Sequence, residues 1–208
     1  MSKKAYSEQE REQIKHDLLV TGLELFSQHG LRNVRLIDII QGVGISKPFF
    51  YTFYTSMEEL VIRILDYQQA LLFQLVEAEL AREDIGWEEK VYNFFCKILY
   101  SRSNHLLVMT QEEEVWVFRR LSPEHYDAFQ KGQEAFYARL LSLWGVPEGR
   151  CDPKVFGNLC LSMVLIHNSA ERALPFFFTD RLEETAEANA HILVRYIASL
   201  LHEDRGAP

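Results

Sequence analysis

The segment Ser46–Phe53, S-K-P-F-F-Y-T-F, carries the side chains whose chemistry best fits contact with duplex DNA. Lys47 offers an ammonium that can reach a phosphate or a guanine edge. Thr52 or Phe49 can pack against the methyl group of thymine. The positions expected to face DNA are Lys47, Pro48, Phe49, Tyr51 and Thr52. For any one of them, ordinary capping or a solvated surface is the alternative.

These side chains need a rigid helix, and the flanking residues predict one. A short helix over about Arg35–Gly42 is followed by a turn containing Gly44. Ser46 is a suitable N-cap for a second short helix over about Lys47–Phe53, and Pro48 is tolerated in its first turn. The pattern is typical of a helix-turn-helix, whose second helix lies in the major groove. Ser46 and Arg35, at or near helix N-termini, can bind backbone phosphates.

Capping signals place longer helices on both sides of this pattern. Ser7 and Glu10 have the spacing of a capping box, which predicts a helix from near Glu8 to Gly30. Gly22 inside that helix indicates close approach of a neighbouring helix. Ser56 and Glu59 repeat the capping pattern and open a long helix over about Met57–Arg82.

The rest of the chain also has helical periodicity, without strand-like alternation. We therefore predict an all-α fold of eight to ten helices, with a helix-turn-helix head over residues 1–55 and a helical body over 56–208. The helices expected in the body are about Trp87–Arg102, Leu106–Thr110 and Glu112–Leu121 as a broken pair, Pro123–Trp144, Pro153–Leu174 and Arg181–His202.

The formal charge is distributed unevenly along the chain. The whole chain carries −8, but residues 1–55 have seven Lys and Arg against six Asp and Glu, or +1. The remaining residues therefore carry −9. A slightly positive end is compatible with DNA contact without requiring it, and it predicts modest non-specific affinity.

The composition and the motifs exclude several other classes of protein. No catalytic or nucleotide-binding motif occurs, so we do not expect an enzyme or a cofactor. The histidines His105, His125 and His167 show no metal-ligand spacing. No signal peptide or membrane span is expected, and the three cysteines fit reduced thiols, which together predict a cytoplasmic location.

Several short motifs in the first sixty residues resemble the tetracycline-repressor (TetR) family of transcription regulators. They are L-x-L-F-x-x-x-G at Leu23–Gly30, D-I at Asp38–Ile39, G-I-S-K at Gly44–Lys47, Tyr51, and S-x-E-E-L at Ser56–Leu60. The family usually has other residues at Val34, Arg35, Ile40, Tyr54 and Thr55. Met57 replaces a frequent lysine that contacts a DNA phosphate, which puts one backbone contact in doubt.

The resemblance implies a homodimer and a ligand-binding body. The dimer would form through residues 153–174 and 181–202, and Tyr51 would direct its hydroxyl to a phosphate. Two recognition helices roughly 34–36 Å apart would read a near-palindromic operator. A small, largely apolar effector would release the DNA, so that the protein acts as a repressor. Two alternatives remain: a body that binds another protein, and an activator.

Residues of the body that are candidates for contact with an effector are mostly large and apolar. Most of the aromatic residues are expected in the core, and some along a cavity. Candidates for the cavity are Phe94, Trp116, Phe136, Met163 and His167. His167 alternatively belongs to the core or to the dimer seam. Glu112–Glu114 would either attract a cationic ligand or, as we favour, form a solvated face.

Overall fold

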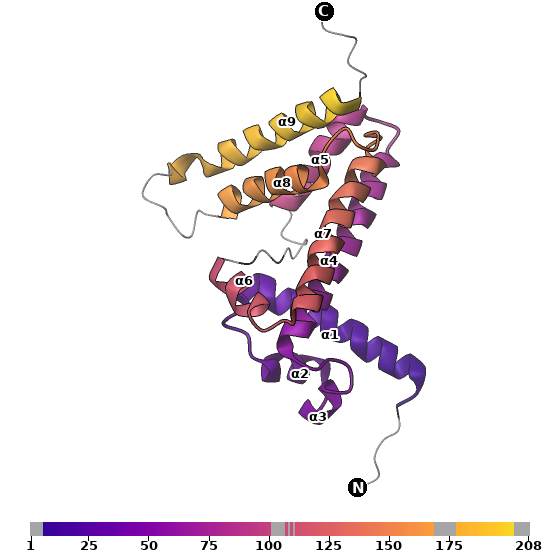
Figure 1. Ribbon diagram of the computed structural model, residues 1–208, viewed down its shortest axis with the longest axis vertical. Coiled ribbons are helices and arrows are strands. Elements are labelled where there is room, and N and C mark those ends of the chain that lie inside the picture. The colour runs from indigo at the N-terminus through magenta and orange to yellow at the C-terminus, as the bar shows by residue number, and fades with distance from the viewer. Residues whose placement is uncertain (1–5, 101–106, 108, 110, 169–177, 202–208) are drawn as a thin grey trace, which may run out of the picture. The chain divides into compact units, whose positions relative to one another are not determined.

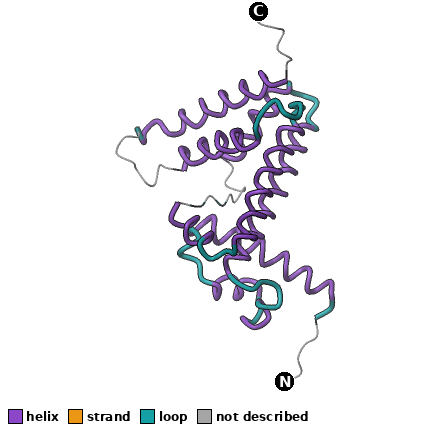
Figure 2. Tube along the Cα trace, viewed as in Figure 1, coloured by secondary structure: helices purple, strands orange, loops and turns teal. Residues whose placement is uncertain are grey.

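The computed structural model describes residues 6–100, 107, 109, 111–168 and 178–201 (Figure 1). Within these residues the regular elements are helices, and no strand occurs (Figure 2). The predicted all-α class is therefore confirmed. Expected segments at residues 101–106 and 169–174 lie outside the described residues.

The observed helices follow the predicted ones, with shorter ends in several places. Ser7 closes the predicted capping box with Glu10, so the first helix begins where expected. The third helix is shorter than the predicted Lys47–Phe53, because turns rather than helix follow Phe50. The helices are α1 (Glu8–His29), α2 (Leu36–Val43), α3 (Lys47–Phe50), α4 (Met57–Leu80), α5 (Trp87–Tyr100), α6 (Gln111–Phe118), α7 (Pro123–Leu143), α8 (Pro153–Asn168), the 3-10 turn η2 (Thr179–Arg181) and α9 (Leu182–Leu201).

The chain divides into two compact units. The first combines residues 1–70 with 105–127, and the second combines 71–104 with 128–208. The first unit therefore contains α1, α2, α3 and α6 together with the starts of α4 and α7. The predicted functional boundary after residue 55 stays a prediction.

The core of the first unit is apolar and closely packed. Leu18, Ile39, Phe50 and Leu60 are fully buried. A Cβ added at Gly22 would lie 2.5 Å from the Cδ1 atom of Ile64 on α4. The close approach predicted for Gly22 is thus confirmed, because even a methyl group there would displace the Ile64 side chain.

The second unit is built around an aromatic cluster between α5, α7 and α8. The centroid of the Trp144 ring lies 5.4 Å from that of Phe94, 5.6 Å from that of Phe95 and 5.8 Å from that of Phe156. The Phe94 and Phe156 rings meet Trp144 edge-on, and the Phe95 ring is tilted against it.

The buried carboxylate of Glu79 pairs with Lys97 and, at 3.5 Å, with Arg82. Among the described helices, none has the length and apolar character that crossing a membrane requires.

Candidate nucleic-acid interface

The first half of the helix-turn-helix is α2, whose two ends are fixed by specific backbone contacts. The Asp38 carboxylate accepts hydrogen bonds from the backbone N–H of Arg35, at 2.8 Å, and from its guanidinium. These hydrogen bonds lower the pKa of Asp38. At the other end, Gly44 has φ +75° and donates its N–H to the carbonyl groups of Gln41 and Ile40. A left-handed residue here turns the chain toward α3.

The second half is α3, which begins as the sequence predicts. The Ser46 hydroxyl accepts a hydrogen bond from the N–H of Phe49, and Pro48 occupies the first turn. Phe50 is fully buried, and Tyr54 is only 3% exposed. Phe53 is half-buried, so these three aromatic side chains form the inner face of the segment.

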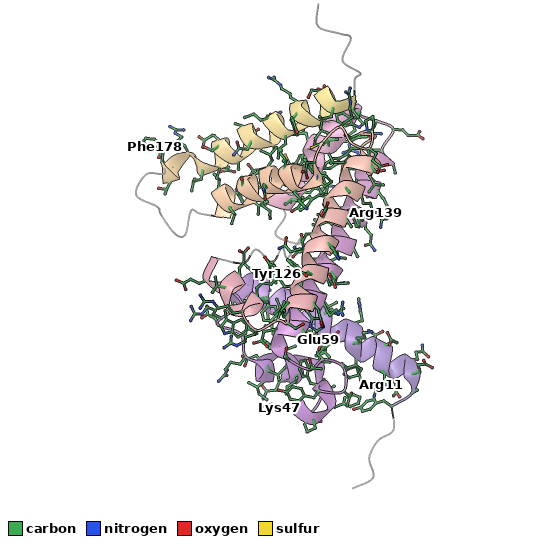
Figure 3. The ribbon with its side chains drawn as sticks, in the orientation of Figure 1. Arg11, Lys47, Glu59, Tyr126, Arg139 and Phe178 are labelled. Carbon is green, nitrogen blue, oxygen red and sulfur yellow. The ribbon has the colours of Figure 1, made fainter. Side chains whose placement is uncertain are left out.

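Most of the predicted DNA-facing side chains are exposed along one segment. Ser46, Lys47, Pro48, Tyr51 and Thr52 are exposed, and Arg35 is exposed at the start of α2. Figure 3 shows Lys47 on α3 with its side chain on the outside of the unit. These positions carry hydroxyl groups and cations on α2 and α3, and their contact with DNA stays a prediction.

Phe49 is the exception within this set, because it is half-buried under residues from the N-terminal end of the chain. Tyr6 stacks on its ring with a centroid distance of 4.5 Å. The Arg11 guanidinium lies 5.6 Å from the same ring and 4.8 Å from that of Phe53. Sequence reasoning missed Tyr6 and Arg11, because helical periodicity does not reveal which distant segment an exposed arginine contacts.

A second group missed by sequence reasoning joins α6 to the turn between α1 and α2. Glu113 is 5% exposed, and its carboxylate accepts a hydrogen bond of 2.8 Å from the N–H of Leu31. Glu112 pairs with Arg32 at 2.9 Å. The favoured solvated face is therefore wrong for Glu113, because the backbone N–H following α1 requires a buried acceptor.

The start of α4 has a modified capping box. The Ser56 hydroxyl accepts a hydrogen bond from the N–H of Glu59 at 3.1 Å. The Glu59 carboxylate accepts from both the N–H and the hydroxyl of Thr55, at 2.7 and 2.6 Å. Burial raises the pKa of Glu59, but the hydrogen bonds from Thr55 outweigh it, so the net direction is down.

The candidate effector contacts fall in both units. Phe94, Phe136 and Met163 are buried within the second unit, where Phe136 packs 5.0 Å from Phe73. The Nδ1 atom of His167 is buried without a hydrogen-bond partner among the described residues. Trp116 belongs to the first unit, where the Arg120 guanidinium lies 4.6 Å from its ring.

The described residues offer no group of three or more His, Cys, Asp or Glu side chains that could hold a metal ion. The first unit exposes the polar side chains of its helix-turn-helix. Residues 18–64 match the family model described as bacterial regulatory proteins, tetR family. The part of the chain that holds α2 and α3 therefore matches the TetR family of regulators.

Several solved structures have a similar fold over nearly the whole chain. This chain is 15% identical to reduced NemR from E. coli, with a TM-score of 0.55 over 93% of this chain and 100% of that one. A TetR-family regulator from Cytophaga hutchinsonii is 13% identical, with a TM-score of 0.58 over 97% and 100%. SCO4454 from Streptomyces coelicolor is 16% identical, with a TM-score of 0.54 over 92% and 97%. No curated protein matches.

The family model bears on the class of the protein through residues 18–64. TetR-family regulators are transcription factors that bind DNA through a helix-turn-helix, and they are not enzymes. The prediction that this chain is not an enzyme is therefore confirmed. At identities below 20%, the solved structures show the shared fold alone.

Proposed function

We propose that this TetR-family protein is a ligand-responsive repressor that binds a near-palindromic operator as a homodimer. The observation that carries the proposal is the exposed row of Lys47, Tyr51 and Thr52, which is backed by the fully buried Phe50. The ammonium and hydroxyl groups can contact phosphates and base edges. Action in the cytoplasm stays a prediction of the sequence.

The proposed dimer is supported by apolar side chains that the single chain leaves in solvent. On α8, Val155 and Leu159 are 51% and 41% exposed, and Leu161 and Leu165 are 46% and 52% exposed. On α9, Ile192 is 62% exposed. The expected interface segments, 153–174 and 181–202, include these residues. Large apolar side chains gathered on two neighbouring helices are typical of an interface.

The proposed effector site is supported by the environment of His167. Its ring meets that of Tyr100 edge-on at 5.3 Å, while the Nδ1 atom has no partner among the described residues. A buried polar atom without a partner is costly, so a polar group of a bound effector would stabilise it. This observation favours an effector over the alternative of a protein partner bound to the body.

The proposed release of DNA requires a link between the effector and the helix-turn-helix. The long helix α4 supports such a link, because its residues belong to the first unit up to Ala70 and to the second unit from Leu71. Contacts from α6 give a second route, since Glu113 and Glu112 hold Leu31 and Arg32 just before α2. An effector that favours another position of α6 or α4 would lower operator affinity, and DNA would lower effector affinity by the same factor.

The DNA-binding part of the proposal is tested with duplexes selected by the wild-type protein from a random-sequence library. The Lys47→Ala, Tyr51→Ala double variant should lose at least about tenfold in affinity for the selected duplex, because a phosphate or base contact is lost at each position. Fluorescence anisotropy measures the affinity, and circular dichroism verifies the fold. Unchanged affinity in the folded variant would remove the assignment of α3.

The effector part is tested by native mass spectrometry of the freshly purified protein. A bound small molecule that is released on unfolding, and whose addition weakens binding to the selected duplex, supports the repressor. An additional polypeptide in place of a small molecule would support the alternative, in which the body binds a protein.

A further inference from the structure

The N-terminal end of α1 forms an aromatic and cationic cluster with the recognition segment, residues 46–54. Phe49 is stacked by Tyr6 and meets Phe53 edge-on at 5.1 Å. The Arg11 guanidinium lies over both phenyl rings. Its Nη2 atom also lies 3.5 Å from the Thr52 hydroxyl, which itself donates a hydrogen bond to the carbonyl of Phe49 at 2.8 Å. Figure 3 labels Arg11 on α1 and Lys47 on α3 within the same unit.

The recognition segment needs such external support because it is too short to be stable by itself. A helix of four residues gains little from its own hydrogen bonds, since nucleation is unfavourable. On its inner side, Phe50 and Tyr54 are buried in the core. On its outer side, Tyr6 and Arg11 supply the contacts. The segment is thus held between the core and the first turns of α1.

We propose that Arg11 is a positioning residue, which fixes the orientation of the recognition segment through Phe49, Phe53 and Thr52. The inference rests on the proposed DNA-binding function. A cation over aromatic rings is attracted to their electron-rich faces, and a planar guanidinium can cover two rings at once. The contacts that place the Arg11 guanidinium are with the two rings and the Thr52 hydroxyl.

Binding measurements can distinguish this positioning role from a direct contact between Arg11 and DNA. A positioning residue changes the affinity for the selected sequence but not the number of phosphates that the protein neutralises. A phosphate contact contributes to the affinity for duplexes of any sequence. Its loss reduces the slope of log affinity against log salt concentration by about 0.9.

The test compares Arg11→Gln with Lys15→Gln, its matched control. Lys15 lies on the next turn of α1, is exposed, and pairs with Glu12 at 3.9 Å, so the control removes the same charge without changing a side chain of the cluster. Arg11→Gln should weaken binding to the selected duplex by about tenfold, with an unchanged salt slope and unchanged binding to a random-sequence duplex. Equal effects of the two variants, or a slope reduced only in Arg11→Gln, would overturn the proposal.

A double-mutant cycle with Phe53→Leu tests whether Arg11 acts through the rings. If it does, the double variant binds the selected duplex no more weakly than the worse single variant. Multiplicative losses would show that the two residues act independently, and this would overturn the proposed route through Phe53. Thermal unfolding of each variant verifies that the unit remains folded.

Hydrogen exchange separates this inference from the proposed function, because it needs no DNA. The N–H groups of Thr52, Phe53 and Tyr54 donate to Phe49 and Phe50 carbonyls at 2.9–3.2 Å. Their exchange should be faster in Arg11→Gln than in the wild type and unchanged in Lys15→Gln. Unchanged exchange in both variants contradicts the positioning role. If exchange is faster in Arg11→Gln but the wild-type protein selects no duplex, the positioning role is upheld and the proposal of DNA binding is ended.

Discussion

Two buried polar side chains in the first unit have opposite hydrogen-bonding situations. The Glu113 carboxylate accepts the N–H of Leu31 at 2.8 Å, and Leu31 itself is 2% exposed. The Tyr54 hydroxyl, in contrast, is buried with no partner among the described residues. Burial raises the pKa of Tyr54 to about 12, so the hydroxyl stays protonated near neutral pH. The energetic consequences of removing each polar group should therefore differ in sign.

We expect Glu113→Ala to destabilise the protein by about 1–3 kcal/mol, because it leaves the Leu31 N–H buried without an acceptor. Tyr54→Phe should leave stability unchanged or slightly increased, since it removes an unpaired hydroxyl and keeps the ring. Urea unfolding followed by circular dichroism compares both variants with the wild type. A stability loss in Tyr54→Phe equal to that of Glu113→Ala would show that the Tyr54 hydroxyl has a partner.

At the scale of single residues, the sequence predicted the binding face better than its supports. The exposure of Lys47 and Tyr51 and the burial of Phe50 follow from local spacing, which the family motif reinforces. The contacts of Arg11 and Glu113 join segments 41 and 82 residues apart in the chain. Local spacing does not reveal contacts between segments so far apart, so neither contact could be predicted from the sequence.

At the scale of elements, the turn between α2 and α3 depends on backbone conformation rather than on packing. Gly44 has φ +75°, and a Cβ built there would meet nothing within 4 Å. The position therefore isolates the cost of a left-handed backbone from any steric clash. Gly132, within α7, likewise has open space around it but has no positive φ.

Gly44→Ala should destabilise the protein by roughly 1–2 kcal/mol, because an L-residue disfavours the left-handed region. Gly132→Ala is the matched control, and it should stabilise by about 0.5–1 kcal/mol because alanine loses less entropy in a helix. Differential scanning calorimetry would show opposite shifts of the unfolding temperature. Shifts in the same direction would mean that the turn adopts another conformation in solution.

The helices themselves were predictable from the sequence, whereas their ends were less so. The capping box of Ser7 and Glu10 located the start of α1 correctly, because both hydrogen bonds are local. The predicted end of α3 at Phe53 was too late, since Tyr51 already closes the helix and the burial of Phe50 and Tyr54 determines the path that follows. Tertiary packing thus overrides local helical preference at this point.

At the scale of the whole molecule, exposed apolar surface on the second unit is what the proposed dimer would bury. α8 and α9 pack against each other, yet Leu165 and Ile192 remain 52% and 62% exposed. The sequence could not distinguish these residues from core residues, because α8 is apolar on more than one face. The resemblance to the TetR family supplied the expectation, and the exposure of these side chains supports it.

Leu165→Glu should convert the proposed dimer into a monomer, because association would bury a charge against apolar side chains. Val20→Glu is the control, since Val20 is 38% exposed on α1 and lies outside the expected interface. Light scattering measures the mass of each variant, and anisotropy with the selected duplex measures binding. If α8 forms the interface, Leu165→Glu loses both the doubled mass and most of its operator affinity, because one head can contact only half of a near-palindromic site. A dimeric Leu165→Glu protein would place the interface elsewhere, whereas a monomeric variant with full affinity would show that operator binding does not depend on pairing the two heads.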